Sequence, residues 1–306
     1  MVSAGLLWFL FDSLRDNDLG VQLKRMPLSA ITAASILLML QGPILALRWH
    51  QVLKVLGTHI PLGKLVGISF VGLFFNQALP TSIGGDAVRM WKIAHAGVAT
   101  QVAVSSVLNE RLSGFIVLVL IVTVGTPFIW PMLETPNIRF LWSVVVLVSF
   151  LGLTTFLVMH RLPEPLAAQL RVTKLIQYSR NFVELLRAGR TAVSLALLGL
   201  LSWTVAIAAV VTLGLGLGIS VPSGYYVILV PMVILLMIVP ISIGGWGIRE
   251  GAFVYLFGQV GVSSAESFVL SVFFGLALIS ASLPGCIFWL LERPYKTRDD
   301  RGIRFD

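Results

Sequence analysis

The chain has 306 residues, 57% of them hydrophobic and only 12% charged, with a formal net charge of +8. Soluble domains average about 25% charged residues, so this composition excludes a soluble globular protein, and with it a disordered chain, a collagen or a disulfide scaffold. The single cysteine, Cys286, cannot form an intrachain disulfide, and the four histidines show no metal-ligand spacing. The basic residues cluster between apolar runs, which argues against nucleic-acid binding.

A membrane-spanning helix needs about 20 mostly apolar residues. Five segments meet this requirement: 28–47, 112–130, 140–159, 192–219 and 268–291. Two further apolar segments, 62–80 and 224–243, each run into a cluster of proline and glycine. The stretch 2–11 is too short to span, so we expect 1–27 to be either the tail of a first helix or an interfacial segment. The sequence thus predicts an all-α polytopic membrane protein.

The polar segments differ in charge. Segment 48–64 carries Arg48, Lys54 and Lys64 and no acid, segment 160–191 has six bases against two acids, and the tail 293–306 is basic. Under the positive-inside bias, these three regions are expected on the cytoplasmic side of a bacterial cytoplasmic (inner) membrane. Within 163–190, leucines and other apolar residues mix with bases, which predicts an amphipathic helix on the inner membrane surface or, equally, a solvated connector.

An internal repeat is the most informative pattern in the chain. Residues 80–85 read Pro-Thr-Ser-Ile-Gly-Gly and residues 240–245 read Pro-Ile-Ser-Ile-Gly-Gly, and Arg89 and Arg249 follow at the same offset. All six identities share one shift of 160 residues, from Pro80 to Pro240. We therefore expect a transmembrane domain over 28–292, with repeat 1 at about 28–159, a linker at 160–191 and repeat 2 at about 192–292.

The charge bias and the repeat together predict the topology. If 48–64 and 160–191 are both cytoplasmic, segment 65–111 has to enter the membrane and return, roughly as 65–79 inward and 97–109 back. By the same count, 224–262 starts and finishes on the outer side, so the two motifs enter from opposite faces. This gives seven to eight membrane segments, two of them re-entrant, in an inverted repeat. The alternative makes 224–243 and 246–262 two full crossings.

Inverted repeats with interrupted helices are typical of transporters, whose substrates bind where the breaks meet near the midplane. Proline ends the preceding helix, Gly-Gly permits unusual backbone angles, and the N–H groups of a following helix favour an anion. The alternative is that each motif only makes a tight turn between helices.

Charged residues beside both motifs are costly at membrane depth and are often functional. Arg89 and Arg249 can each grip a phosphate through two hydrogen bonds. The structural alternative is an internal ion pair, Arg89 with Glu110 or Arg249 with Glu250. Asp86, in the first turn of the following helix, fits a purely structural role equally well. Trp246 stands where Asp86 stands in the first motif and is expected to contact an acyl chain or sugar, or to plug the turn. The other tryptophans near segment ends, Trp49 among them, are interpreted as interfacial anchors.

Three elements resemble the lysylphosphatidylglycerol synthase transmembrane, or flippase-like, family. They are the run from Asn76 to Arg89, the run from Glu110 to Gly114, and the run from Pro240 to Gly251. The resemblance covers roughly 25–292 and implies a stand-alone lipid translocator without the soluble synthase domain. The departure is at the N-terminus, where the family begins with a complete helix.

We therefore expect a protein that moves a phosphate-bearing lipid or glycolipid between leaflets, with membrane lipids as partners and a lipid- or glycan-biosynthesis enzyme as a further one. No cofactor, metal or nucleic acid is expected, and the chain lacks ATPase, hydrolase or transferase motifs. The alternatives are a non-transporting partner of a lipid- or glycan-modifying enzyme and a membrane enzyme using Asp86 or Glu110. The expected headgroup contacts are Asn76, Pro80, Ser82, Gly84, Gly85, Asp86, Arg89, Glu110, Arg111, Pro240, Ser242, Gly244, Gly245, Trp246, Arg249 and Glu250.

Overall fold

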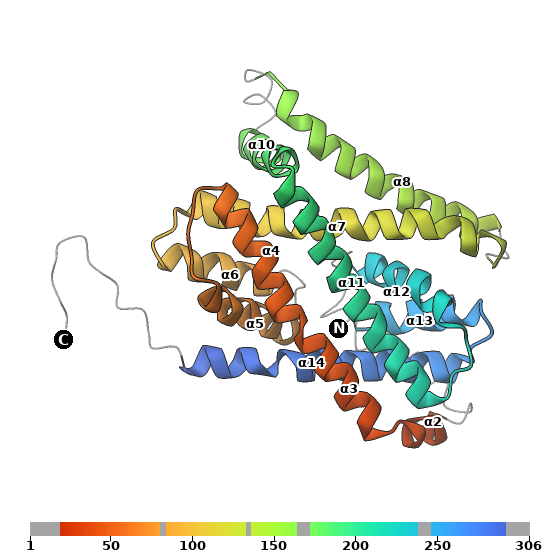
Figure 1. Cartoon of the computed structure of the whole chain (residues 1–306). Helices are drawn as coiled ribbons and strands as arrows, with labels where there is room; N and C mark the ends of the chain where they lie inside the picture. Colours follow the sequence, from red (N-terminus) through yellow and green to blue (C-terminus); the bar gives the residue numbers. More distant parts are fainter. Residues whose placement is uncertain (1–18, 80–83, 133–135, 164–171, 238–245, 292–306) are drawn as a thin grey trace.

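The computed structural model describes residues 19–79, 84–132, 136–163, 172–237 and 246–291, and no strand occurs in these ranges (Figure 1). The helices in chain order are α2 (Leu19–Arg25), α3 (Leu28–Met39), α4 (Gln41–Val55), α5 (Leu62–Ala78), α6 (Gly84–His95), α7 (Thr100–Ile129), the 3-10 turn η1 (Trp130–Met132), α8 (Pro136–Val158), the 3-10 turn η2 (Met159–Arg161), α10 (Thr173–Arg187), α11 (Arg190–Leu217), α12 (Ser223–Met237), α13 (Ile248–Gly258) and α14 (Ser264–Leu291).

Five helices are long and apolar enough to cross a membrane, and they confirm the five predicted spans. They are Leu28–Val55, Thr100–Ile129, Trp142–Arg161, Arg190–Leu217 and Ser264–Leu291. The first of them consists of α3 and α4, which meet at Leu40. Pro43 follows three residues later and has no N–H to donate to Met39, so the helical hydrogen bonding is interrupted at this point. The chain is thus a multi-pass, all-α membrane protein.

The two interrupted segments each form a pair of short helices. α5 and α6 are antiparallel, because Gly85 lies beside Asn76 and Arg89, further along α6, lies beside Gly72. α12 and α13 pack together in the same way, with Tyr226 and Phe257 rings 5.3 Å apart. A helix of 11 to 15 residues spans roughly 16–22 Å, less than the about 30 Å of a bilayer core. The two-crossing alternative for 224–262 is therefore disfavoured.

The return leg of the first pair differs from its prediction. It is α6, at Gly84–His95, whereas 97–109 was expected and instead contributes the first turns of α7. The sequence places Asn109, Glu110 and Arg111 together, which looks like the end of a hydrophobic segment. In the structure Asn109 and Glu110 are buried, so α7 continues through them without a break.

Helix order repeats along the chain. A long first span (α3–α4), a short pair (α5, α6) and a long last span (α7) are followed in the second half by α11, α12, α13 and α14 in the same roles. The two halves are interleaved: α5 packs against α14, α12 packs against α7, and α11 crosses α3 and α4. Gln41 and Ser202 exchange two hydrogen bonds at that crossing, with Gln41 Nε2 donating to the Ser202 carbonyl at 2.8 Å.

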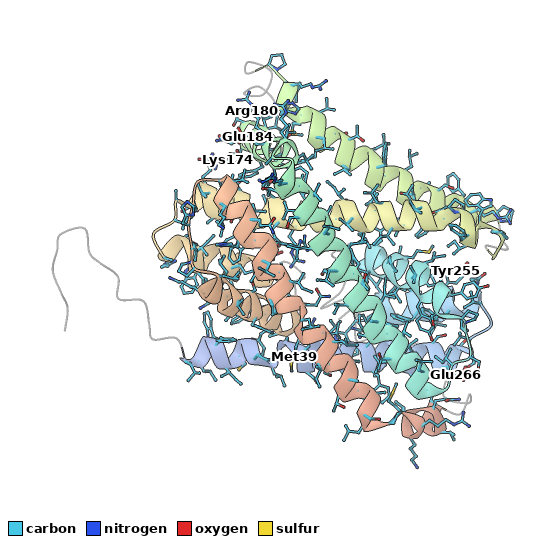
Figure 2. All side chains as sticks on the ribbon, viewed as in Figure 1. Met39, Lys174, Arg180, Glu184, Tyr255 and Glu266 are labelled. Carbon is cyan, nitrogen blue, oxygen red and sulfur yellow. The ribbon has the colours of Figure 1, made fainter. Side chains whose placement is uncertain are left out.

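Figure 1 shows that the two short pairs lie toward opposite ends of the long helices, α5 and α6 on the left and α12 and α13 on the right. The end of α4, helix α10 and the end of α14 gather on the left. Lys174, Arg180 and Glu184 of α10 lie on this side, whereas Tyr255 and Glu266 lie on the other (Figure 2). The three regions predicted to share a membrane side therefore lead to one end of the molecule, as far as the described residues reach.

α8 and α10 connect the two halves and have no counterpart among the residues that the structure describes. α8 is the least buried span, with Phe140, Leu147, Phe150 and Leu151 all exposed, as expected for a helix surrounded by lipid. α10 is amphipathic and buries Ile176, Phe182 and Leu185 while its bases point outward. This confirms an amphipathic helix within 163–190, and its place on the inner membrane surface stays a prediction.

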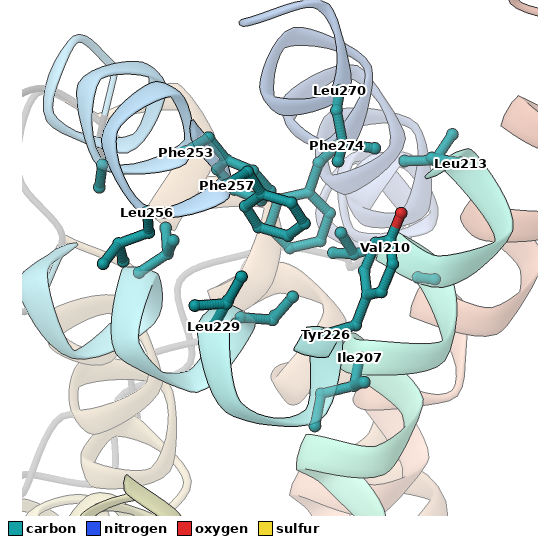
Figure 3. Packing of buried hydrophobic residues seen from close by; sticks show 14 of the residues in the cluster. Ile207, Val210, Leu213, Tyr226, Leu229, Phe253, Leu256, Phe257, Leu270 and Phe274 are labelled. Carbon is teal, nitrogen blue, oxygen red and sulfur yellow. The ribbon is translucent and has the colours of Figure 1, made fainter. Parts of the chain in front are cut away.

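The main hydrophobic core is formed largely by α11, α12, α13 and α14, and α3 and α7 of the first half also contribute to it. Figure 3 shows rings and aliphatic side chains from all four helices meeting there, with Phe253 and Phe257 stacked at 5.2 Å beside Phe274. Tyr226 reaches into the same cluster, and Gly214 leaves room for its hydroxyl group. This packing fixes α13 against α14 and so determines where its first residues, Arg249 and Glu250, lie.

Candidate functional site

The first candidate centre forms where α6 begins against α5. Gly85 lies so close to Gly72 that a Cβ at Gly85 would collide with the Gly72 carbonyl oxygen. A Cβ at Gly72 would collide with the Arg89 side chain. Asn76 Oδ1 accepts a hydrogen bond from the Gly85 N–H at 2.9 Å, which ties the first turn of α6 to α5. Small residues in the motif thus bring two backbones together and place Arg89, one turn later, inside the molecule.

Arg89 is the centre of a charged cluster. Its Nη1 lies 3.2 Å from Asp86 Oδ1 and 3.1 Å from Glu110 Oε2. Arg111 forms a two-point ion pair with Asp86, through Nε at 2.8 Å and Nη2 at 2.9 Å. Both predicted relationships, Asp86 with Arg89 on one helix face and Arg89 with Glu110 as an ion pair, are confirmed. Helices α6 and α7 contribute these charges.

Arg48 of α4 completes the cluster. Its Nη2 lies 3.0 Å from Glu110 Oε1 and also donates to the Glu110 carbonyl at 2.7 Å and to Ser113 Oγ at 3.0 Å. Gly114 makes room for this guanidinium, since a Cβ there would lie 2.5 Å from Nη2. Glu110 therefore bridges two arginines from different helices, at an exposed fraction of 1%.

The Trp49 ring packs against the Arg89 guanidinium in the first centre. The Arg89 guanidinium carbon lies 4.3 Å from its ring centroid, a cation–π distance, and the indole Nε1 donates to Ser106 Oγ at 3.0 Å. Trp49 and Arg48 are both buried, so the prediction of an interfacial anchor at 49 is wrong, and Arg48 lies within helix α4 rather than in a loop. α4 continues to Val55, beyond the apolar run, because the charge of Arg48 is compensated inside the protein.

The second candidate centre is at the start of α13. Arg249 Nη2 lies 2.6 Å and Nε 3.0 Å from the same oxygen, Oε1 of Glu250, and Nε also donates to Ser271 Oγ at 3.2 Å. Glu250 Oε2 accepts from the Gly247 N–H, and Gly247 has φ 92°, a conformation that suits glycine. Both charged side chains are completely buried. The predicted ion pair of Arg249 with Glu250 is confirmed.

The two centres place a tryptophan ring and a polar side chain beside the arginine in the same way. The Trp246 ring lies 4.3 Å from the Arg249 guanidinium carbon, as the Trp49 ring does for Arg89. In each half the last spanning helix offers a polar residue to the arginine, Glu110 on α7 and Ser271 on α14. Gly275, four residues after Ser271, leaves the space that the Arg249 guanidinium occupies. Trp246 thus packs on an arginine, a contact that was not among its predicted alternatives.

The expected site residues fall into three groups. The structure brings together Asn76, Gly84, Gly85, Asp86, Arg89, Glu110 and Arg111 in the first centre, and Trp246, Arg249 and Glu250 in the second. Pro80, Ser82, Pro240, Ser242, Gly244 and Gly245 lie outside the described residues. Within the described ranges, no group of three or more His, Cys, Asp or Glu side chains is placed to hold a metal ion.

Both arginines retain hydrogen-bonding capacity. Arg89 Nε and Nη2, and Arg249 Nη1, are buried and have no acceptor among the described residues. A buried donor left without a partner costs about 1–3 kcal/mol, and more when it is charged. Such groups therefore mark positions where a ligand can bind.

Comparison with known proteins agrees with this architecture. The family model described as "Lysylphosphatidylglycerol synthase TM region" matches residues 1–285. The chain belongs to this family. A "UPF0104 membrane protein" of Methanothermobacter thermautotrophicus is 22% identical to it over 255 residues, covering 74% of this chain and 72% of the relative. Membership in this lysylphosphatidylglycerol synthase TM region family confirms the resemblance seen in the three sequence elements.

Proposed function

We propose that the protein is a lipid translocator that moves the phosphate-bearing headgroup of a lipid or glycolipid between the two leaflets. One observation carries the proposal: equivalent arginines of the repeat, Arg89 and Arg249, are both buried in the first two turns of a short helix, and both keep N–H groups that have no acceptor among the described residues. The short helix pairs that hold them lie toward opposite ends of the molecule (Figure 1). A headgroup bound by one arginine and then by the other would pass from the helix pair of one membrane side to the helix pair of the other.

The physical basis is the cost of moving a charge through lipid. A phosphate is expensive in hydrocarbon, whereas buried guanidinium groups attract it and offer two parallel hydrogen bonds. The lipid chains need no protein path, because they remain in the bilayer. Asp86, Glu110 and Glu250 hold the arginines in place while no headgroup is bound, so each pair can open when a phosphate replaces its carboxylate.

The proposal assigns no bond-making step to the chain. Asp86 and Glu110 are each paired with two arginines, so both carboxylates serve as counter-ions within the cluster. In the same proposal, the protein lies in the cytoplasmic membrane of a bacterium, with 48–64, 160–191 and the C-terminus facing the cytoplasm, and a lipid- or glycan-biosynthesis enzyme supplies its substrate.

The test is a leaflet assay with the purified, full-length protein in liposomes containing a fluorescent phosphatidylglycerol. Arg89→Gln and Arg249→Gln are each expected to reduce translocation at least tenfold while the protein still inserts, and Arg→Lys is expected to recover only part, because the planar fork is lost. Arg180→Gln, which removes an exposed charge on α10, is the matched control. Normal transport by both glutamine variants would overturn the proposal and favour a non-transporting membrane partner.

A further inference from the structure

The two arginines differ in which edge of the guanidinium group is free. In Arg89 both carboxylates approach one nitrogen, Nη1, at 3.2 and 3.1 Å. Nε and Nη2 have no acceptor among the described residues, although the side chain is only 1% exposed. These two nitrogens form the edge that binds two oxygens of a phosphate side by side. The ring of Trp49 lies over a face of the group, with its centroid 4.3 Å from the guanidinium carbon.

Arg249 presents the opposite arrangement. Its Nε and Nη2 both bind Glu250 Oε1, at 3.0 and 2.6 Å, so the same edge is occupied by a neighbouring residue of the chain. Only Nη1 lacks an acceptor in the described part of the molecule. A phosphate therefore finds a free two-point edge at Arg89 and a closed one at Arg249.

Charge makes the same distinction. The first centre joins Arg48, Arg89 and Arg111 to two acids, Asp86 and Glu110, which leaves an excess of one positive charge. The second centre joins one arginine to one glutamate and is neutral. Because an unbalanced charge within a membrane protein is costly, the first centre favours a ligand that carries one negative charge.

We propose that the Nε–Nη2 edge of Arg89 is the anion-binding site in this conformation, that its ligand is the singly charged phosphodiester of a lipid, and that Arg249 is held closed by Glu250. Arg48 acts as a positioning residue, since it holds Glu110 from the side opposite Arg89. This assignment deepens the translocator function proposed above and rests on it. It also separates lipids with a phosphodiester from those with a phosphomonoester or a diphosphate.

The exposed part of the cluster indicates where a headgroup enters. The Arg111 side chain is 47% exposed, whereas that of its partner Asp86 is 10% exposed. Arg111 directly precedes the apolar run 112–130 of the predicted span. A charged group exposed at the edge of a span needs water or a phosphate as its neighbour. The headgroup therefore approaches Arg89 through the Asp86–Arg111 pair.

The same substitution in the two repeats provides a matched test. We expect Arg89→Lys to weaken binding of phosphatidylglycerol at least tenfold, because lysine keeps the charge and removes the two-point edge. Arg249→Lys should change binding less than twofold, because that edge is already occupied. Native mass spectrometry of the detergent-solubilised full chain measures both, with diacylglycerol as the lipid without phosphate. An equal or larger loss in Arg249→Lys would overturn the assignment.

A second variant tests the charge balance independently of Arg89. Asp86→Asn raises the excess charge of the first centre from one to two, so it should raise the ratio of bound phosphatidic acid to bound phosphatidylglycerol at least fivefold at pH 8, where a phosphomonoester carries nearly two charges. Arg180→Gln, a charge change on exposed α10, should leave the ratio unchanged. An unchanged ratio in Asp86→Asn would overturn the phosphodiester assignment, even if Arg89→Lys does not fold.

Different outcomes would overturn the assigned binding site and the translocator function. If the wild-type protein translocates phosphatidylglycerol but Arg89→Lys binds it normally, the site assignment is wrong and the translocator function stands. If the wild-type protein binds phosphatidylglycerol through Arg89 and moves none of it in liposomes, the translocator function is wrong and the binding site stands.

Discussion

The carboxylate of Glu250 organises the whole second centre. It accepts hydrogen bonds from the Gly247 N–H, from Arg249 and from Ser271, and it is completely buried. Each of these donors would lose its acceptor if the carboxylate were removed. The arginine would then remain as a buried charge without a counter-ion, which is the costliest consequence.

We therefore expect Glu250→Ala to destabilise the protein by about 3–5 kcal/mol, the usual penalty for breaking one partner out of a buried ion pair. Thermal unfolding in detergent, followed by size-exclusion chromatography, measures the change. Glu184→Ala, on the exposed face of α10, is the control and should shift the midpoint very little. A Glu250→Ala protein as stable as this control would mean that Arg249 finds another counter-ion.

Individual site residues were predictable to different degrees. Arg89, Glu110, Arg249 and Glu250 stand out because charge is rare beside apolar runs, and their pairs follow from spacing and proximity to the motifs. Arg48 could not be recognised, because its partner Glu110 lies 62 residues away on another helix. Ser271 and Gly275 belong to an ordinary apolar helix, and their roles depend on how α13 packs against α14.

The α5–α6 pair depends on glycine at one point of closest approach. The Gly85 Cα faces the Gly72 carbonyl oxygen, and a Cβ there would overlap with backbone, which cannot rotate away as a flexible side chain can. Gly251 belongs to the family-like motif of the second half, yet a Cβ at that position meets nothing within 4 Å. The two motif glycines thus have different physical roles.

Gly85→Ala is therefore expected to separate α5 from α6 and to destabilise the protein by about 1–3 kcal/mol or more, as overpacking of a tight contact does. Gly251→Ala should be neutral or slightly stabilising, because alanine favours a helix interior. Thermal unfolding in detergent compares the two variants directly. Equal stability of both would show that the backbones can move apart at no cost.

Most helices were predictable because hydrophobicity and length alone identify a membrane span. Their ends were not: α4 extends to Val55 and α7 begins at Thr100, so both continue through charged residues. In the sequence, Arg48 and Glu110 each stand at the limit of an apolar run. Each instead compensates the other at 3.0 Å, and paired charges no longer end a helix.

The inverted arrangement of the two halves has a direct test. In a Cys286→Ser background, Lys174→Cys on α10 and Pro222→Cys before α12 place single thiols at exposed positions. We expect Lys174→Cys to react with a membrane-impermeant maleimide only from the cytoplasmic side and Pro222→Cys only from the outer side, because α11 crosses the membrane between them. Labelling of both from one side would contradict the inverted repeat.

The hydrogen bonds between Gln41 and Ser202 raise the question of how the chain adopts a single orientation in the membrane. Position 202 lies one residue from the counterpart that the 160-residue shift assigns to Gln41, so the same helix surface supplies both partners of the contact, as in a dimer with twofold symmetry. Because this contact is symmetric, each half of the chain can form it in either membrane orientation. The contact alone therefore does not determine which side of the membrane a half faces during biosynthesis. We expect the bases of α10, together with those of 48–64 and of the tail 293–306, to decide between the two orientations.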